Sequence, residues 1–366
     1  MNLKQPPKYM MLKQEILSWI ASGQIRPDEQ MPSEHEIAAR YGLSRQTVRQ
    51  ALGELEKEGW LYRVQGKGTF VAQPQPKVPA AREIRMIAMV TTYISDYIFP
   101  HIVRGAESAL RSRGYSLTLS STDNDKEKER ENLKQLLDQP FDGYIIEPTK
   151  SAQGNPNLDL YLMLQSRGKP FVMINERYPE LFCPCLKMDD ETGAYMATRH
   201  LIELGHTNIA GFFKIDDLQG ANRLKGFVRA FKEFGLSLRP NSITPYTTET
   251  AKTAPLEAAH TLLKQEPGSR PTGFVCYNDE LAVQLLEVPR MLGLSVPDDL
   301  SVVGFDDSSL AVATEVKLTS IVHPKSEMGM AAANLLLDII EGNKSLNQQE
   351  IMYAPELVVR ESTRAL

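Results

Sequence analysis

Segment 44–52, SRQTVRQAL, carries side chains that can bind the edges of DNA bases. Arginine can donate two hydrogen bonds to guanine O6 and N7, and glutamine can pair with N6 and N7 of adenine. Apolar residues of the same stretch recur at helical spacing, so a helix here turns its polar residues outward. The outward residues in its N-terminal half are Arg45, Gln46, Thr47, Arg49 and Gln50. A solvated helix face without a ligand is the alternative interpretation.

A second set of polar side chains follows strand-like runs farther along the chain. Its members are Glu147, Asn175, the pair Asn278-Asp279 and the pair Asp306-Asp307. In an open parallel α/β sheet the ligand lies outside the carboxyl ends of the strands. Carboxylates and amides, without a phosphate-binding glycine loop or a nucleophile elbow, suit a neutral polyhydroxylated ligand. For Asp307 we expect helix capping instead, because Ser308 and a helix follow it.

Three helices and a hairpin are needed to position the first set. Apolar residues at helical spacing predict a first helix that ends at Gly23, and Ser33 with Glu36 forms a capping box for a second. A glycine turn then leads to Ser44, which caps the third helix. Segments 60–64 and 69–71 flank a glycine turn with a lysine at its tip, which predicts a hairpin. This order of elements is typical of a winged helix-turn-helix.

The second set requires an α/β fold. Helical stretches separate a series of strand-like runs. These runs lie at 86–92, 115–120, 143–147, 171–175, 209–213, 273–277 and 300–305. This alternation predicts βαβ units and parallel sheets. Segment 72–84, AQPQPKVPAAREI, is rich in proline and has no apolar periodicity, which indicates an extended linker. We therefore expect a DNA-binding domain at 1–72, a linker at 73–84 and a larger domain at 85–366.

Composition restricts the classes of function. The 366 residues carry a net charge of −5, but residues 1–72 carry +2 and the rest −7, so phosphate contacts belong to the front. Three cysteines give no disulfide framework. Cys183-Pro-Cys185 resembles half a metal site, yet no second pair or histidine cluster accompanies it, so we expect structural thiols and no metal. Without a long apolar stretch or a leader, the sequence predicts a cytoplasmic protein without membrane contact.

The front motifs, PSEHEIA, YGLSRQTVRQAL and GKGTFV, resemble the DNA-binding domain of the GntR family of regulators. The resemblance covers residues 8–71 and implies which side chains face DNA. These are Lys8, Glu34, Arg45, Gln46, Arg49, Gln65 and Lys67. Glu34 has two interpretations: a base contact that accepts from cytosine N4, or a charge that complements the helix dipole.

The motifs of the larger domain resemble the sensor domain of LacI-type repressors, a two-lobed relative of periplasmic sugar-binding proteins. They are RLKGF at 223–227, ND at 278–279, VPDDLSVVGFDD at 296–307 and LTSI at 318–321. Arg223, Asn278 and Asp306 match positions that hydrogen-bond the effector in that family. Glu147 and Asn175 are weaker candidates at matching strand ends. After the first strand, where the family brings an aromatic ring against the sugar, the candidates are Asp96, Tyr97 and Phe99.

Two features depart from that family. The linker lacks the helix pattern of the minor-groove hinge of LacI repressors, so we do not expect that mode of DNA contact. Pro289 lies inside the helix expected after Asn278, which predicts a kink or a shortened helix.

The fusion of a GntR-type front to a LacI-type sensor resembles the repressors of L-arabinose utilisation in Gram-positive bacteria. The resemblance implies a homodimeric repressor that binds double-stranded operator DNA and releases it when L-arabinose binds, without a cofactor. The identity of the sugar rests on the resemblance alone, and another pentose or hexose is the alternative. A transport binding protein would lack residues 1–72. An aminotransferase-like GntR regulator would need a Schiff-base lysine beside a phosphate-binding site, so we expect no enzyme.

Overall fold

The computed structural model describes residues 7–73, 85–95, 97–343 and 350–366 and divides the chain into two compact units, Met1–Glu83 and Ile84–Leu366. The expected linker at 73–84 lies outside the described residues, apart from Gln73.

The first unit is a winged helix-turn-helix. It contains α1 (Lys8–Ala21), α2 (Glu34–Tyr41), α3 (Arg45–Lys57), β1 (Leu61–Val64) and β2 (Gly68–Val71), with β1 and β2 antiparallel. The predicted capping box is confirmed: Glu36 N donates to Ser33 Oγ, and Ser33 N donates to Glu36 Oε2. The predicted apolar face of α3 is also confirmed, because Val48, Ala51, Leu52 and Leu55 are all buried. That burial forces the polar residues of α3 outward.

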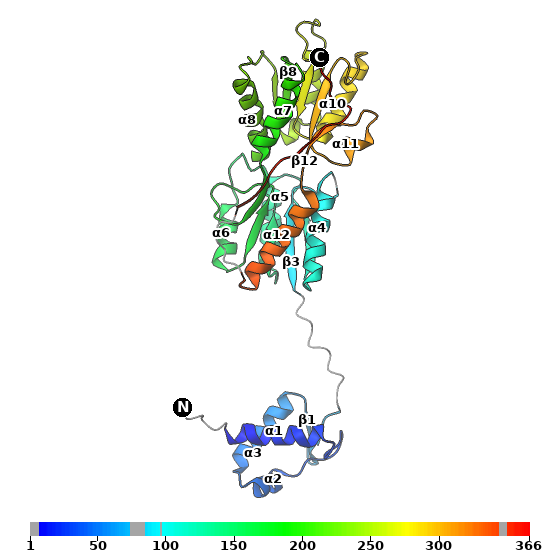
Figure 1. Ribbon diagram of the computed structural model, residues 1–366. Helices are drawn as coiled ribbons and strands as arrows, with labels where there is room; N and C mark the ends of the chain where they lie inside the picture. The colour runs from blue at the N-terminus through cyan, green and yellow to red at the C-terminus, as the bar shows by residue number, and fades with distance from the viewer. Residues whose placement is uncertain (1–6, 74–84, 96, 344–349) are drawn as a thin grey trace. The chain divides into compact units, whose positions relative to one another are not determined.

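The second unit contains two six-stranded sheets, which define two lobes (Figure 1). The sheet of the first lobe has the order β13-β7-β6-β5-β3-β4 and is parallel throughout. Its strands are β3 (Met86–Thr91), β4 (Ser116–Ser121), β5 (Gly143–Ile146), β6 (Phe171–Ile174), β7 (Cys185–Met188) and β13 (Glu350–Tyr353).

The sheet of the second lobe has the order β14-β12-β11-β10-β8-β9 and is parallel except for β14. Its strands are β8 (Ile209–Lys214), β9 (Ile243–Tyr246), β10 (Gly273–Cys276), β11 (Ser301–Asp306), β12 (Thr319–Val322) and β14 (Leu357–Val358). All seven predicted runs are strands, so the predicted two-lobed α/β fold is confirmed. The strands β7, β9, β12, β13 and β14 were not among the predicted runs.

Helices cover both sheets (Figure 1). Around the first sheet lie α4 (Phe99–Ser112), α5 (Lys126–Leu137), α6 (Leu158–Ser166) and α12 (Lys325–Ile340). Around the second lie α7 (Asp190–Glu203), α8 (Leu218–Glu233), α9 (Ala254–Leu263), α10 (Asp279–Met291) and α11 (Leu310–Ala313). Pro289 lies in the last turn of α10, where the helix ends two residues later, at Met291.

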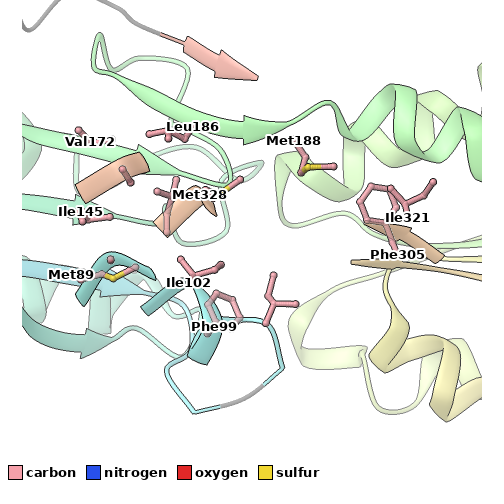
Figure 2. Close-up of a cluster of buried hydrophobic side chains, with 14 of the residues drawn as sticks. Met89, Phe99, Ile102, Ile145, Val172, Leu186, Met188, Phe305, Ile321 and Met328 are labelled. Carbon is pink, nitrogen blue, oxygen red and sulfur yellow. The ribbon is translucent and has the colours of Figure 1, made fainter. Parts of the chain in front are cut away.

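One apolar core runs from the first lobe into the second (Figure 2). Met89, Ile145 and Val172 supply it from the first sheet, and Phe305 and Ile321 supply it from the second. The chain passes between the lobes three times, after β7, after β12 and after β13. The shared core and these crossings hold the lobes at a common hinge, and the cavity described below lies where both lobes contribute residues.

Candidate functional site

The N-terminal half of α3 presents the predicted DNA-binding side chains to solvent. Ser44 caps the helix by accepting from Thr47 N at 3.2 Å. Arg45, Gln46 and Arg49 are exposed, while Thr47 is half-buried, with its hydroxyl 2.8 Å from that of Ser44. Exposed arginine and glutamine side chains at a recognition-helix N-terminus can reach base edges in a major groove.

Glu34 links the recognition helix to the hairpin. Arg49 donates to Glu34 Oε2 from Nε at 3.2 Å and from Nη2 at 3.0 Å, and Arg63 Nη2 lies 3.6 Å from Glu34 Oε1. The hydrogen bond from Arg49 lowers the pKa of Glu34. Glu34 therefore positions two arginines from neighbouring elements, a role that neither sequence-based interpretation included. The sequence did not predict the contact between Arg63 and Glu34, because only the fold brings β1 beside α2.

Arg45 has a neighbour that the sequence did not reveal. Its Nη2 lies 3.0 Å from Nδ1 of His35, the second residue of α2. Because a guanidinium can only donate, His35 Nδ1 is the acceptor and the ring carries its proton on Nε2. This contact orients Arg45 at the start of the recognition helix.

The turn between β1 and β2 carries Gln65 and Lys67, both exposed. Lys67 N donates to Val64 O at 3.0 Å, and the Lys67 carbonyl accepts from Gln30 Nε2 at 2.6 Å. Gly68 has φ +118°, and a Cβ there would lie 2.7 Å from Gln30 Nε2, so only glycine fits the turn. Lys8, the remaining candidate, is the exposed first residue of α1.

A cavity of about 570 Å³ lies in the second unit and is lined by residues of both lobes. Volumes of about 300–1,000 Å³ are typical of small-molecule sites. Seven sequence-predicted candidates line it together: Tyr97, Phe99, Glu147, Asn175, Arg223, Asn278 and Asp306. The eighth, Asp96, lies outside the described residues.

Arg223 is the most constrained polar side chain of the cavity. Its Nε donates to Asp190 Oδ1 at 2.7 Å, Nη1 to Tyr277 O at 2.6 Å and Nη2 to Asp306 Oδ1 at 3.4 Å. The ring of Phe305 packs 3.6 Å from the guanidinium carbon. Burial opposes the charge, but the two carboxylates outweigh burial and raise the pKa of Arg223. Among the described residues three of its five donors are used, which leaves two for a ligand.

Glu147 and Asn175 form a buried polar wall at the ends of β5 and β6. Glu147 accepts from Thr92 N at 2.8 Å, from Thr92 Oγ1 at 2.6 Å and from Asn175 Nδ2 at 2.6 Å. Asn175 adopts φ +65°, the left-handed conformation that asparagine tolerates. Burial raises the pKa of Glu147, although these donors partly offset it.

The aromatic candidates after β3 differ in their roles. Tyr97 adopts φ +59°, and its buried hydroxyl donates to Phe305 O at 3.0 Å and accepts from Asp279 N at 3.1 Å. Tyr97 therefore ties the first lobe to the second. Phe99 begins α4, and its ring contacts Tyr93 edge to face, with centroids 5.7 Å apart.

Asn278 and Asp306 lie at the carboxyl ends of β10 and β11. Asn278 is the N-cap of α10 and accepts from Leu281 N through Oδ1 at 2.9 Å. The backbone of Asp306 turns sharply, with φ +90°. The capping role expected for Asp307 is wrong: α11 begins only at Leu310, and Asp307 Oδ1 instead pairs with Arg360 Nη2 at 2.7 Å. The C-terminal segment brings Arg360 to the sheet. The carboxylate of Asp307 therefore has an ionic partner and does not cap the helix that follows.

Lys214 and Asp217 also line the cavity and were missed. Lys214 Nζ lies 2.9 Å from Asp217 Oδ2, which also accepts from Tyr277 OH at 3.0 Å. Lys214 is the last residue of β8, so the strand-end rule that selected Glu147 would have found it. Lys214 pairs with Asp217 and Arg223 pairs with Asp306, so these charges are compensated within the wall, which suits an uncharged ligand rich in hydroxyls.

The cysteines and the possible metal ligands of the chain were also candidate site residues in the sequence. Cys183, Cys185 and Cys276 are free and buried, and burial raises the pKa of the Cys183 thiol to about 12. Over the described ranges, no group of three or more His, Cys, Asp or Glu side chains could hold a metal ion. In the same part of the chain, no helix combines the length and apolar character needed to cross a membrane.

Comparisons with known proteins agree with both units. Residues 8–71 match the bacterial regulatory proteins of the gntR family, and residues 198–363 match the periplasmic binding protein-like domain. The solved LacI family transcriptional regulator from Enterococcus faecium with bound ribose is 27% identical, with a TM-score of 0.66, and the match covers 77% of this chain and 100% of that one.

Two relatives extend over the whole chain. The arabinose metabolism transcriptional repressor of Geobacillus stearothermophilus is 58% identical over 366 residues, 100% of both chains. The protein of the same name from Halalkalibacterium halodurans is 51% identical over 362 residues, 97% of this chain and 96% of that one. The chain is thus a regulator and not an enzyme, and it belongs to the family of arabinose metabolism transcriptional repressors, in which a GntR-type winged helix-turn-helix precedes a LacI-type periplasmic-binding-protein-like domain.

Proposed function

We propose that this chain is a homodimeric repressor of L-arabinose utilisation genes that binds operator DNA without sugar and releases it when L-arabinose enters the cavity. The observation that carries the proposal is the convergence of seven predicted side chains on one cavity, in a chain with full-length relatives named for arabinose metabolism. We divide the chain at 1–72, 73–84 and 85–366 into reader, linker and sensor. Because its operator lies in the bacterial cytoplasm, the protein acts there.

For DNA, we assign base contacts to Arg45, Gln46 and Arg49, which are exposed at the start of α3. The other predicted residues are assigned to contacts with DNA phosphates or, through the hairpin, with the minor groove. They are Thr47, Gln65, Lys67 and Lys8. Glu34 acts mainly by positioning Arg49, because both oxygens of its carboxylate are already engaged. A bidentate base contact discriminates sequence, whereas a lysine on a phosphate adds affinity without sequence preference.

For sugar, we assign hydroxyl contacts to Arg223, Asn278, Asp306, Glu147 and Asn175. Arg223 and the Asn278 amide donate, while the carboxylates and the Asn175 carbonyl accept. Phe99 and Tyr97 supply aromatic surface to the ring carbons, and Asp96 adds a further acceptor. A neutral ligand fits because Arg223 and Lys214 already pair with the carboxylates of Asp306 and Asp217.

Dimerisation follows from the size of the reader. One recognition helix and one hairpin contact too few bases for operator-level specificity, and two readers on paired half-sites supply the rest. The sugar then acts because it binds one arrangement of the two lobes more tightly than the other. This difference in affinity changes the population of the DNA-binding form.

The test combines two titrations of the full chain. Calorimetry with L-arabinose, D-xylose, D-ribose and D-galactose should show tight binding of L-arabinose alone. Fluorescence anisotropy with a duplex selected in vitro from random sequences should show that L-arabinose lowers DNA affinity. By thermodynamic linkage, the duplex must lower sugar affinity by the same factor. Preference for another of the four sugars would reassign the effector, and DNA affinity that ignores every sugar would refute the sensor.

A further inference from the structure

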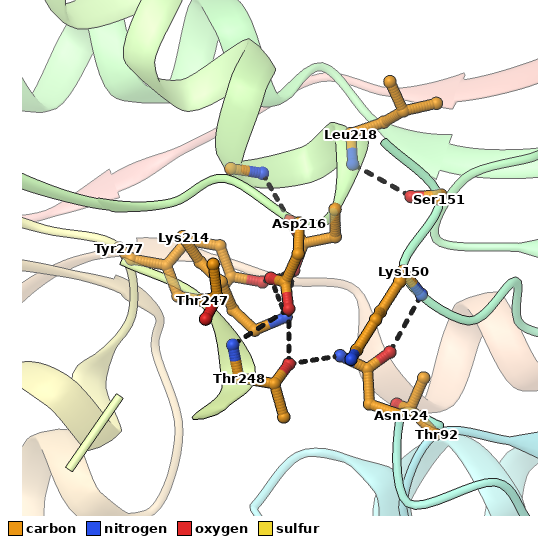
Figure 3. A network of polar contacts seen from close by, with 12 residues as sticks. Thr92, Asn124, Lys150, Ser151, Lys214, Asp216, Leu218, Thr247, Thr248 and Tyr277 are labelled. Atoms are coloured by element: carbon orange, nitrogen blue, oxygen red, sulfur yellow. Dashed lines mark hydrogen bonds and ion pairs between the residues drawn. The ribbon is translucent and has the colours of Figure 1, made fainter. Parts of the chain in front are cut away.

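A set of contacts joins the two lobes at the rim of the cavity (Figure 3). We call it the rim latch and define it by Asn124 and Lys150 of the first lobe and Thr248 and Glu249 of the second. Asn124 Nδ2 donates to Thr248 Oγ1 at 2.6 Å, and Lys150 Nζ forms an ion pair with Glu249. The two contacts lie beside each other because Asn124 Oδ1 also accepts from Lys150 N at 2.9 Å.

The second lobe holds its side of the rim latch in a fixed geometry. Thr248 donates to Asp216 Oδ2 from Oγ1 at 2.6 Å and from its backbone N at 2.9 Å. Asp216 is fully buried and is paired with Lys214 Nζ at 2.7 Å. The Thr248 hydroxyl thus has one orientation, in which its lone pairs are free to accept from Asn124. Figure 3 shows this sequence of side chains from Lys214 to Asn124.

The first lobe holds its side with backbone conformations that are uncommon outside glycine. Asn124 has φ +55° and Lys150 has φ +40°. Such conformations persist only where the surrounding contacts determine them, and they cluster at functional sites. The hydrogen bond from Lys150 N to Asn124 Oδ1 attaches the loop that carries Lys150 to the turn that carries Asn124.

A second pair of contacts runs parallel to the rim latch. Leu218 N donates to Ser151 Oγ at 2.9 Å, and Ala152 N donates to Asp216 O at 3.3 Å. Both hydrogen bonds join the loop after β5 to the turn after β8. Their amide protons are therefore reporters of lobe separation that do not depend on a ligand.

We propose that the rim latch sets the affinity of the sensor for its sugar by stabilising the closed arrangement of the lobes. This inference rests on the proposed sugar-sensing function. Asn124, Thr248 and Glu249 line the cavity, whereas Lys150 is not among the described residues that do, so replacing Lys150 tests closure without removing a side chain from the cavity wall. A contact that exists only when the lobes are together raises the closed population, and a ligand held by both lobes binds more tightly in proportion.

The ion pair is the part of the rim latch that can be tested without disturbing the fold. The Lys150 side chain is 15% exposed and that of Glu249 is 61% exposed. The proximity of Lys150 lowers the pKa of Glu249 to about 2, so both groups are charged at neutral pH. Exposed pairs have small coupling energies, and reversing one charge converts a modest attraction into a repulsion. We therefore expect Lys150→Glu to weaken L-arabinose binding by about three- to tenfold, through faster dissociation.

Two further variants of the full chain complete the design. Lys150→Glu combined with Glu249→Lys restores the pair with opposite polarity and should return sugar affinity to within about twofold of wild type. The matched control is Lys128→Glu, because Lys128 pairs with Asp123 at 2.7 Å within the first lobe alone and its replacement changes the net charge equally. This control should leave sugar affinity unchanged.

Calorimetry and stopped-flow dissociation with L-arabinose measure affinity, and hydrogen–deuterium exchange of peptides containing Ala152 and Leu218 measures closure in the sugar-free protein. Faster exchange in Lys150→Glu, slowed again in the charge-swapped variant, is the expected result. Exchange that is equal in wild type, Lys150→Glu and Lys128→Glu would overturn the latch even if no sugar bound. Unchanged sugar affinity in Lys150→Glu, beside a wild type that binds L-arabinose, would overturn its role in affinity. A wild type that binds no sugar refutes the proposed function separately.

Discussion

His323 Nε2 lies 3.2 Å from Asn175 Oδ1, and this contact joins a crossing between the lobes to the wall of the cavity. Because Asn175 Nδ2 already donates to Glu147 Oε1, its carbonyl oxygen must accept, so His323 carries its proton on Nε2. His323 is buried, and its Nδ1 has no hydrogen-bond partner among the described residues. The hinge and the sugar wall therefore share one chain of hydrogen bonds, in which the His323 ring is neutral because burial lowers its pKa.

This neutral histidine makes stability depend on pH. Burial lowers the pKa of His323 to about 4, although Asp306 opposes the effect and Lys325 and Arg223 reinforce it. The unfolded chain binds its proton near pH 6.5, so the contribution of the neutral ring is complete above that pH. It is lost as the pH falls from about 6.5 to about 4, at up to about 1.4 kcal/mol per pH unit. His323→Gln, which can still donate to Asn175, should lose less stability over this window.

Urea unfolding followed by far-UV circular dichroism at several pH values measures this difference. Tryptophan fluorescence is unsuitable, because Trp19 and Trp60, the two tryptophans, both lie in the first unit. The difference between the unfolding free energies of wild type and variant at each pH isolates His323, because the contributions of carboxylates that titrate in the same pH range cancel. Parallel pH profiles would show that His323 binds its proton over the same pH range in the folded and the unfolded chain, so that burial does not lower its pKa.

Arg45→Ala should lower affinity for the selected operator by roughly 1–3 kcal/mol, with a much smaller loss on random duplex DNA, because a bidentate base contact carries discrimination. Anisotropy titrations on both DNAs at one salt concentration measure the difference. Lys57→Ala is the matched control, since Lys57 is exposed in the last turn of the same helix. Equal losses on the two DNAs would reassign Arg45 to a phosphate.

Lys67→Ala at the tip of the hairpin should weaken operator and random DNA alike. The slope of log K against log salt is negative, and one lost phosphate contact makes it less steep by about 0.9. Titrations at several salt concentrations measure this slope for wild type and variant. A slope that does not change would remove Lys67 from the DNA interface.

Local sequence signals predicted the elements well. The capping box of Ser33 and Glu36 and the burial pattern of α3 depend on residues a few positions apart, and both are confirmed. The strand-end rule also selected cavity residues at the ends of four different strands, two in each sheet, because parallel strands bring their carboxyl ends to one edge of their sheet. Strands such as β9, with the sequence ITPY, escaped prediction because a proline interrupts a short run at the edge of the sheet.

Contacts between distant segments could not be predicted. Glu34 meets Arg49 and Arg63 only because α2, α3 and β1 pack together, and no spacing in the sequence encodes that meeting. Asp307 was assigned to a helix cap from its immediate neighbours, whereas Arg360 reaches it from the C-terminal segment. The rim latch was missed for the same reason, since Asn124 and Thr248 belong to different lobes.

Arg223→Ala should destabilise the second unit as well as abolish sugar binding. The substitution leaves the carboxylates of Asp190 and Asp306, both almost fully buried, without their cationic partner. Breaking a buried ion pair in this way costs about 3–5 kcal/mol. Urea unfolding measures the loss, and Lys225→Ala at an exposed position of the same helix should change stability by less than about 0.5 kcal/mol. Wild-type stability in Arg223→Ala would mean that the two carboxyl groups are protonated in the folded protein.

A cleaner separation of sugar binding from folding comes from Asn278→Asp. The N-cap of α10 needs only the Oδ1 acceptor for Leu281 N, and aspartate supplies it equally well, so we expect stability to stay near wild type. The change removes the amide donor at the cavity wall, and an unsatisfied sugar hydroxyl costs about 1–3 kcal/mol. L-arabinose affinity should therefore fall about ten- to a hundredfold. Operator affinity without sugar should remain unchanged, because the reader is untouched.

The resulting repressor should release DNA only at correspondingly higher sugar concentration, which anisotropy across an L-arabinose titration measures. Asn278→Ala is the comparison, because it removes both the cap and the donor and should add about 1 kcal/mol of destabilisation to the same loss of affinity. If Asn278→Asp released the operator at the wild-type sugar concentration, the Asn278 amide would not touch the sugar, and its place at the cavity wall would reflect helix capping alone.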